Sequence, residues 1–259
     1  REHFKAIRDR LSNGGLFCQW LPLFQLDTYG LRVITATFLE VFPDASALLL
    51  RLNTDTPVIG LIGGHRSPFW SPEALERRLN HPSLRDALRP MALAEVLPVM
   101  GTWFADAETL RTYSQCVVIN TDDHPFLLFD APRTLGPQTP KGQALLSELL
   151  DLQRPIPQEL CAGRPAEECA RLRSYLEARD AYLRGLIAES EGRPEEAAQG
   201  FLRSVVLSAD FTPGYAQLIT RASLRARSDP DGARRLLDRL IEARPERPVA
   251  RDLKVRLGL

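Results

Sequence analysis

The sequence predicts an α/β domain followed by an all-α tail, on three observations. Near the N-terminus a helical stretch, a Gly-Gly turn and a buried strand follow one another. A second helix then leads into two short strands joined by a turn, and from residue 167 onward apolar residues recur only at helical spacing. Alternating helices and strands are typical of an α/β sheet, whereas uninterrupted helical periodicity indicates a separate helical domain.

The first helix, turn and strand occupy residues 1–20. Apolar residues at helical spacing end at Leu11, and residues 13–15 (Asn-Gly-Gly) tolerate the positive φ that a helix C-terminus needs. Residues 16–18 are a short apolar run, which predicts a strand covered on both faces. Since α/β sheets place their chemistry at the carboxyl ends of strands, Gln19 and Trp20 lie where a site is expected.

The next predicted elements are a helix and a hairpin. The helix covers residues 27–41, with Asp27 or Thr28 as its N-cap. Residues 47–52 and 58–62 read as strands, and the short turn-rich connection between them predicts an antiparallel hairpin.

Residues 65–114 are predicted to be mainly helical. Ser71 followed by Pro72 is a helix start signal, and residues 85–100 and 106–113 continue with short helices. Three aromatic side chains of this stretch are expected in the core: Trp70, Trp103 and Phe104. Residues 116–119 are a last apolar, strand-like run that leads into the sequence Asn-Thr-Asp-Asp-His-Pro.

A stretch rich in Pro and Gly, residues 132–142, predicts a domain boundary. We therefore expect a sheet domain over residues 1–133, a linker with a short helix over 134–166, and a helical domain over 167–259. The spacing within the helical domain resembles that of tetratricopeptide repeats. The residues that carry this resemblance are Gly185, Ala197, Phe201 and Ala209 in a first copy, and Ala233, Leu237, Leu240 and Pro245 in a second.

Composition excludes several classes of function. The 259 residues carry a formal net charge of zero, with 44% hydrophobic and 25% charged residues, so we expect no nucleic-acid partner and no anionic membrane surface. No apolar run approaches the roughly 20 residues that span a bilayer, and no secretory signal is recognisable. We therefore expect a cytoplasmic chain without a membrane segment, and leave open whether one was attached upstream.

The four cysteines are scattered without the spacing of a metal site, so no metal is expected. Reduced and mostly buried thiols are the favoured interpretation. Pairing of Cys161 with Cys169 across a loop remains an alternative.

Three motifs in order resemble the C-terminal half of spermidine-synthase-like proteins, the polyamine aminopropyltransferase family. They are residues 14–22 (GGLFCQWLP), residues 37–43 (TFLEVFP) and residues 120–125 (NTDDHP), the last followed by Ala-Pro-Arg at 131–133. The likeness is to the branch often fused to membrane segments, and it covers residues 1 to about 133.

This resemblance implies a seven-stranded Rossmann-like fold of the S-adenosylmethionine-dependent methyltransferase type. It also implies transfer of an aminopropyl group from decarboxylated S-adenosylmethionine to a diamine substrate. In that family the cofactor loop and the catalytic aspartate precede the segment matched here. The first residues already lie inside a helical pattern, so we interpret the chain as a fragment that contains no catalytic residue and binds no cofactor alone.

Three residues are candidates for binding the diamine. Asp122 and Asp123 can supply carboxylates to a cationic amine, although turn capping is an alternative for both. Gln19 can bind substrate or cofactor at the sheet edge, or satisfy a neighbouring loop. Trp20 departs from established spermidine synthases, where a small and then an acidic residue commonly follow this Gln.

Two hypotheses of function follow. The first is a fragment of a spermidine-synthase-like transferase, which supplies the sheet edge and the substrate rim. The second is a protein-interaction module, in which the tetratricopeptide-like tail binds a partner and the sheet domain is a degenerate scaffold. A methyltransferase proper fits the motifs less well.

Overall fold

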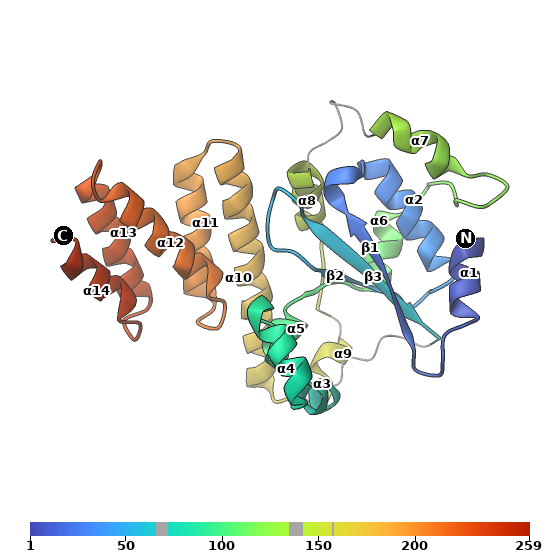
Figure 1. Cartoon of the computed structure of the whole chain (residues 1–259), viewed down its shortest axis with the longest axis horizontal. Coiled ribbons are helices and arrows are strands. Elements are labelled where there is room, and N and C mark those ends of the chain that lie inside the picture. The colour runs from blue at the N-terminus through green and yellow to red at the C-terminus, as the bar shows by residue number, and fades with distance from the viewer. Residues whose placement is uncertain (66–71, 135–141, 157) are drawn as a thin grey trace. The chain divides into compact units, whose positions relative to one another are not determined.

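The computed structural model describes residues 1–65, 72–134, 142–156 and 158–259. The chain divides into two compact units, Arg1–Arg164 and Pro165–Leu259 (Figure 1). The first unit is mixed α/β and the second is helical. The elements of the first unit are α1 (Glu2–Arg8), β1 (Leu16–Pro22), η1 (Leu23–Gln25), α2 (Thr28–Leu39), β2 (Ser46–Leu49), β3 (Val58–Gly64), α3 (Pro72–Leu79), α4 (Pro82–Leu88), η2 (Arg89–Met91), α5 (Val96–Met100), β4 (Trp103–Ala105), α6 (Ala107–Tyr113), α7 (Phe126–Thr134), α8 (Gly142–Leu150) and α9 (Gln158–Cys161).

The described strands form one four-stranded sheet in the order β1-β3-β2-β4, with every neighbouring pair antiparallel. The hairpin predicted from residues 47–62 is confirmed, because β2 and β3 pair antiparallel. Since β3 is antiparallel to both β1 and β2, these two strands run parallel to each other, and β3 lies reversed between them.

One face of the sheet packs on an aromatic core. The ring of Phe17 on β1 lies 6.0 Å from that of Phe38 on α2, and Phe38 lies 4.8 Å from Phe42 and 5.1 Å from Phe4 of α1. Gly63 of β3 faces the same core, where a Cβ atom would come within 2.5 Å of Phe42. The aromatic rings therefore join α1 and α2 to the sheet.

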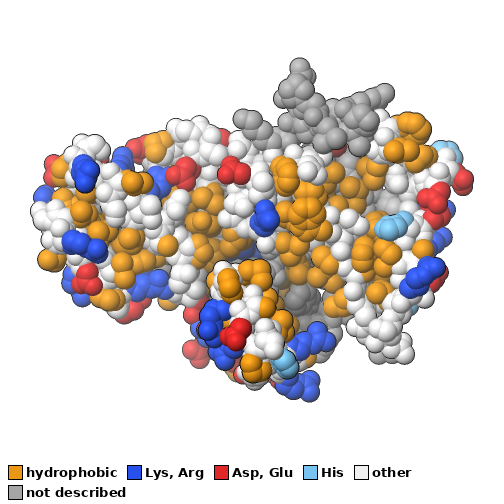
Figure 2. Space-filling view, viewed as in Figure 1, with side chains coloured by type: hydrophobic (Ala, Val, Ile, Leu, Met, Phe, Trp, Pro, Cys, Tyr) orange, Lys and Arg blue, Asp and Glu red, His pale blue; other side chains and the backbone are white. Residues whose placement is uncertain are grey.

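The expected carboxyl end of the first strand, at Gln19 and Trp20, lies too early in the chain, because β1 continues to Pro22. The Leu23 N–H bonds to the Pro57 oxygen, so the backbone of Pro22 faces away from β3 and its missing N–H costs no ladder bond. β1 is an edge strand, and the side chains of Leu16 and Trp20 are exposed on its outer face. In Figure 2, hydrophobic side chains reach the surface of this unit.

The expected helix over residues 85–100 is interrupted. Pro90 lies in the short η2 helix, and Ala92 has a φ of 56°, so α4 and α5 are separate. Residues 116–119 form no strand, since Cys116 adopts a φ of 59° that breaks an extended run. Trp103 and Phe104 are buried as predicted, within β4, a three-residue strand that the sequence did not predict. Trp70 lies outside the described residues.

The cysteines differ from the favoured interpretation. Cys18 and Cys116 are free thiols on the surface rather than in the core. Cys161 and Cys169 are disulfide-bonded rather than reduced. Cys18 is exposed because it shares the outer face of β1 with Leu16 and Trp20.

The second unit consists of helices that pair through short turns. They are α10 (Ala166–Ser190), α11 (Pro194–Leu207), α12 (Pro213–Arg225), α13 (Pro230–Ala243) and α14 (Val249–Arg256). Gly185 of α10 and Gly200 of α11 allow a close helix crossing, since a Cβ at Gly200 would lie 2.8 Å from the Gly185 Cα. Phe201, Leu237 and Leu240 are buried in one shared core.

The structure therefore shows a mixed α/β unit with a small four-stranded antiparallel sheet and a helical C-terminal unit. The seven-stranded Rossmann-like assignment stays a prediction.

The crossing of α10 and α11 predicts the effect of one added methyl group. Ala is favoured over Gly in a helix by about 1 kcal/mol, but at Gly200 the Cβ would overlap backbone atoms that cannot rotate away. We expect Gly200→Ala to lower the free energy of unfolding by about 1–3 kcal/mol in urea denaturation. Gln199→Ala, at an exposed position of the same helix, is the control and should change little. Equal stability of the two variants would contradict the close crossing.

Candidate functional site

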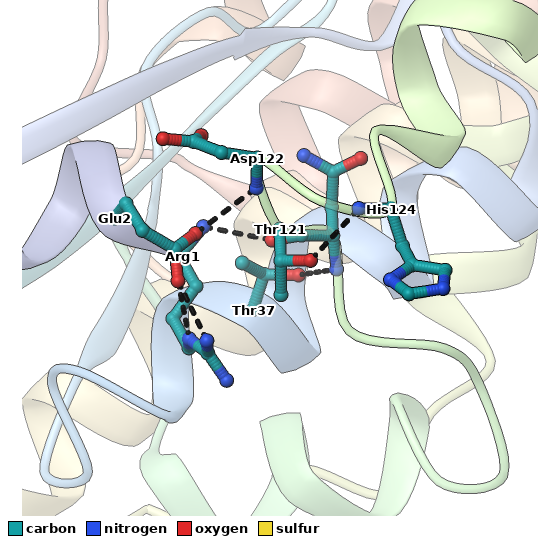
Figure 3. Close-up of polar contacts among 7 residues, drawn as sticks. Arg1, Glu2, Thr37, Thr121, Asp122 and His124 are labelled. Carbon is teal, nitrogen blue, oxygen red and sulfur yellow. Dashed lines mark hydrogen bonds and ion pairs between the residues drawn. The ribbon is translucent and has the colours of Figure 1, made fainter.

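Hydrogen bonds from backbone N–H groups hold the loop that carries Asp122 and Asp123. The Asn120 N–H donates to Thr37 Oγ1 of α2 (2.9 Å), and the Asp122 N–H donates to Glu2 Oε2 of α1 (3.1 Å). The His124 N–H donates to Thr121 Oγ1 (3.1 Å), which closes a turn within the loop (Figure 3). The loop therefore packs on α1 and on the C-terminal half of α2.

The carboxylates of this loop are exposed to solvent. Asp122 and Asp123 are exposed, and no hydrogen bond or ion pair to either carboxylate occurs within the described residues. In Figure 3 the Asp122 carboxylate points away from Thr121 and His124. The hydrogen bond from Arg1 lowers the pKa of Glu2 to about 2, and the Asp122 N–H acts in the same direction. Glu2 therefore holds the loop as a charged acceptor.

Gln19 lies in the middle of β1 opposite Leu61, and not at the carboxyl end of the strand as expected. Its Nε2 donates to the Trp20 oxygen (3.1 Å), a neighbour within the same strand. In the part of the chain that the structure describes, no contact joins Gln19 to Asp122 or Asp123. The structure thus does not bring the three predicted site residues together.

A second polar cluster, which the sequence did not predict, lies at the N-terminus of α2. We call it the α2 N-terminal cluster and define it by Asp27, Thr28, Arg32, Tyr113 and Glu148. Asp27 caps the helix as predicted, accepting the Gly30 N–H (2.6 Å), and Thr28 Oγ1 donates to Glu148 Oε2 of α8 (2.6 Å). The cluster thereby joins α2 to α8.

Arg32 ties the C-terminal end of α6 to α2. Its Nε donates to the Tyr113 oxygen (2.8 Å) and its Nη2 to the Gln115 oxygen (2.7 Å). The guanidinium is thus engaged by neutral carbonyl oxygens, and it forms no ion pair with Asp27 or Glu148 within the described ranges.

The position of the cluster follows from the course of the chain. β1 ends at Pro22, η1 follows directly, and α2 begins at Thr28, so the start of α2 lies beside the carboxyl end of β1. α8 packs against η1. The cluster therefore lies beside the carboxyl end of β1. The loop at 120–125 runs along α2, since Asn120 contacts Thr37 near its C-terminal end and Phe126, which follows the loop, has its ring 5.2 Å from that of Tyr29 at its start.

The Tyr113 side chain has the most unusual environment in the cluster. It is only 8% exposed, and its hydroxyl group makes no hydrogen bond of normal geometry among the described residues, although it lies close enough to Glu148 for a side-chain hydrogen bond to act on it. Burial raises the pKa of Tyr113, and the negative charge of Glu148 acts in the same direction. The hydroxyl therefore remains neutral and protonated at ordinary pH.

Sequence reasoning missed this cluster because its members are far apart in the chain. Only Asp27 carried a local signal, as a helix cap. Tyr113 and Glu148 each read as an ordinary helical residue, and only the packing of α6 and α8 near α2 brings them together.

Two absences apply to the described residues. No group of three or more His, Cys, Asp or Glu side chains there is arranged to hold a metal ion. None of the helices described is both long and apolar enough to cross a membrane.

No protein-family model, curated protein or solved structure matches this chain.

The Tyr113 hydroxyl, which makes no hydrogen bond of normal geometry, predicts a contrast between two buried tyrosines. Tyr113→Phe removes a polar group without a well-placed acceptor, so we expect the free energy of unfolding to stay unchanged or to rise. Tyr215 is equally buried, but its hydroxyl oxygen accepts the Ala250 N–H (3.1 Å). Tyr215→Phe should therefore lower the free energy of unfolding by about 1–3 kcal/mol in urea denaturation. A comparable loss in Tyr113→Phe would show that this hydroxyl is already bonded.

Proposed function

We propose that residues 1–164 form the downstream part of a spermidine-synthase-like aminopropyltransferase. The observation that carries the proposal is the strand order, in which β3 lies reversed between the parallel strands β1 and β2. This is the arrangement that the resembled fold has at the end of its sheet. It occurs in a chain whose motifs at 14–22, 37–43 and 120–125 match that family in order.

The residues present do not suit the cofactor. The connection from β1 to α2, residues 23–27, contains no glycine, so it offers no close approach for a nucleoside or for the methionine end of decarboxylated S-adenosylmethionine. The glycine-rich run at 60–64 lies inside β3, where it pairs with β1 throughout and with β2 as far as Ile62, so it forms a sheet strand rather than a ligand-binding loop. On this proposal the cofactor is held by polypeptide outside residues 1–259, and no step is assigned to it here.

Aminopropyl transfer defines what the remaining residues have to do. The amine nitrogen attacks the methylene carbon beside the sulfonium, the C–S bond breaks to leave a neutral thioether, and the amine loses a proton. A diamine substrate carries positive charge, so its site needs carboxylates and one amine that can be unprotonated. Asp122, Asp123 and Gln19 remain the proposed substrate-binding residues, with no catalytic residue in this chain.

A titration with the cofactor tests this proposal. The purified chain should show no saturable heat in calorimetry with S-adenosylmethionine or with its decarboxylated form, because the cofactor-binding segment is absent. A complete aminopropyltransferase titrated in parallel shows that the ligand and the instrument perform as required. Micromolar binding of the cofactor to residues 1–259 alone would refute the proposal that other polypeptide holds it.

The helical unit supports a second candidate, a protein-interaction module. Pro165–Leu259 forms a compact unit with its own hydrophobic core, as an interaction domain requires. On α12, Gln217 and Arg221 both reach Glu189 of α10, and Leu224 continues the same face one turn further, 75% exposed. This face of α12 is the proposed docking surface for a protein partner.

Two matched substitutions test the docking surface. We expect Leu224→Glu to remove the specific partners recovered by affinity purification with the full chain, because it places a charge on the proposed contact. Val206→Glu introduces the same charge at an exposed apolar position of α11 and should retain those partners. Identical partner sets for both variants, identified by mass spectrometry, would count against the module.

A further inference from the structure

We propose that the free edge of β1 pairs with β1 of a second copy of this chain, antiparallel and about a twofold axis at Cys18. The sheets of the two copies join into one across this axis. The inference concerns residues 1–259 themselves and does not depend on the proposed function. A strand of further polypeptide that extended the sheet at this edge would displace the second copy, because both need the same backbone groups.

The backbone of β1 presents unused hydrogen-bonding groups at this edge. In an antiparallel ladder, the groups of successive residues point alternately toward the partner strand and away from it. The Leu23 N–H bonds to the Pro57 oxygen, so the even-numbered residues of β1 face away from β3. Within the described residues, no backbone group bonds to the outward N–H and C=O groups of Leu16, Cys18 and Trp20. These residues therefore offer donors and acceptors to another strand.

Antiparallel pairing centred on Cys18 uses all of these groups. It places Leu16 opposite Trp20 of the second copy and Cys18 opposite its own counterpart, which gives about six hydrogen bonds, two in each opposed pair. A shift of two residues in one direction brings Pro22 opposite Leu16, where proline has no N–H to donate. The opposite shift leaves Trp20 opposite Gly14, outside the strand. The ends of β1 thus select the register.

One side-chain bond at this edge is compatible with the pairing. Gln19 Nε2 donates to the Trp20 oxygen (3.1 Å), which is one of the outward acceptors. A carbonyl oxygen has two lone pairs, so it can accept an N–H of the second copy as well.

The side chains along this edge are apolar and exposed. Leu16 and Trp20 are 53% and 51% exposed, and Cys18 is a free, exposed thiol. Leu50, 40% exposed, borders the same face, since its Cδ1 and Cys18 Sγ both lie 2.9 Å from the place of a Cβ on Gly60. Pairing sets Leu16 of one copy beside Trp20 of the other, and such cross-strand apolar pairs stabilise a sheet.

Charge allows β1 to face an identical strand. A residue on a twofold axis meets its own copy, so a charged side chain there would repel itself. β1 (LFCQWLP) and its neighbour β3 (VIGLIGG) contain no charged residue. Edge strands are commonly protected from such pairing by charged side chains or by proline. In β1 the one such residue is Pro22, which lies outside the paired residues.

Sedimentation equilibrium of the intact chain tests the inference. We expect the average mass to rise with concentration from the 29.0 kDa of one chain to about twice that value. Cys18→Lys sets two like charges face to face on the axis, at an exposed position, and should weaken dimerisation about tenfold or more. Cys18→Ser adds no charge, and Met91→Lys adds the same charge at an exposed apolar position outside the sheet. Both controls should dimerise as the unchanged chain does.

Cross-linking tests the register. A short bismaleimide should link the two copies in Cys116→Ser through Cys18, because the Cα atoms of such an opposed pair lie about 5.5 Å apart. No linked dimer should form in Cys18→Ser. A mass that stays at 29.0 kDa up to about 100 μM, or a dimer that Cys18→Lys leaves intact, would overturn the inference. A cross-link that depends on Cys116 instead of Cys18 would place the interface elsewhere and would also overturn it.

Discussion

The sheet of the first unit depends on β3, which lies reversed between two parallel strands and must fit closely on both faces. Its sequence, Val-Ile-Gly-Leu-Ile-Gly-Gly, provides this fit with glycines where large neighbours approach. A Cβ at Gly63 would overlap Phe42, and one at Gly60 would lie 2.9 Å from the sulfur of Cys18. Larger residues at these positions would move either the aromatic core or β1, and the order of the sheet depends on both.

The position of the polar cluster follows from that sheet. Because β3 fixes the register of β1 through Pro22, it also fixes where η1 and α2 begin. The N-cap Asp27 then stands beside the carboxyl end of β1, and α8 covers η1 and brings Glu148 within reach of Thr28. The site is therefore built by ordinary packing rather than by a local motif.

Features that depend on residues close in the sequence could be predicted, whereas features that depend on distant contacts could not. The hairpin, the Asp27 cap and the burial of Trp103 were predictable because each depends on residues close in sequence or on hydrophobicity alone. The extension of β1 to Pro22 was not, because proline is tolerated there only through the edge position of the strand. The contact of Thr28 with Glu148 could not be anticipated from either helix, because only the packing of α8 near α2 brings the two residues together.

The solvation of the motif loop bears on how such a chain can act. Asp122 and Asp123 belong to the motif that resembles the aminopropyltransferases, yet their loop is held by α1 and by Thr37 near the C-terminal end of α2. Phe126, directly after that loop, packs against Tyr29 at the start of the same helix. A solvated carboxylate interacts weakly with a cation, because water and salt screen the attraction. If this loop binds a diamine, its exposed carboxylates alone provide a weak and salt-sensitive contact, and tight binding requires a less solvated acceptor elsewhere in the pocket.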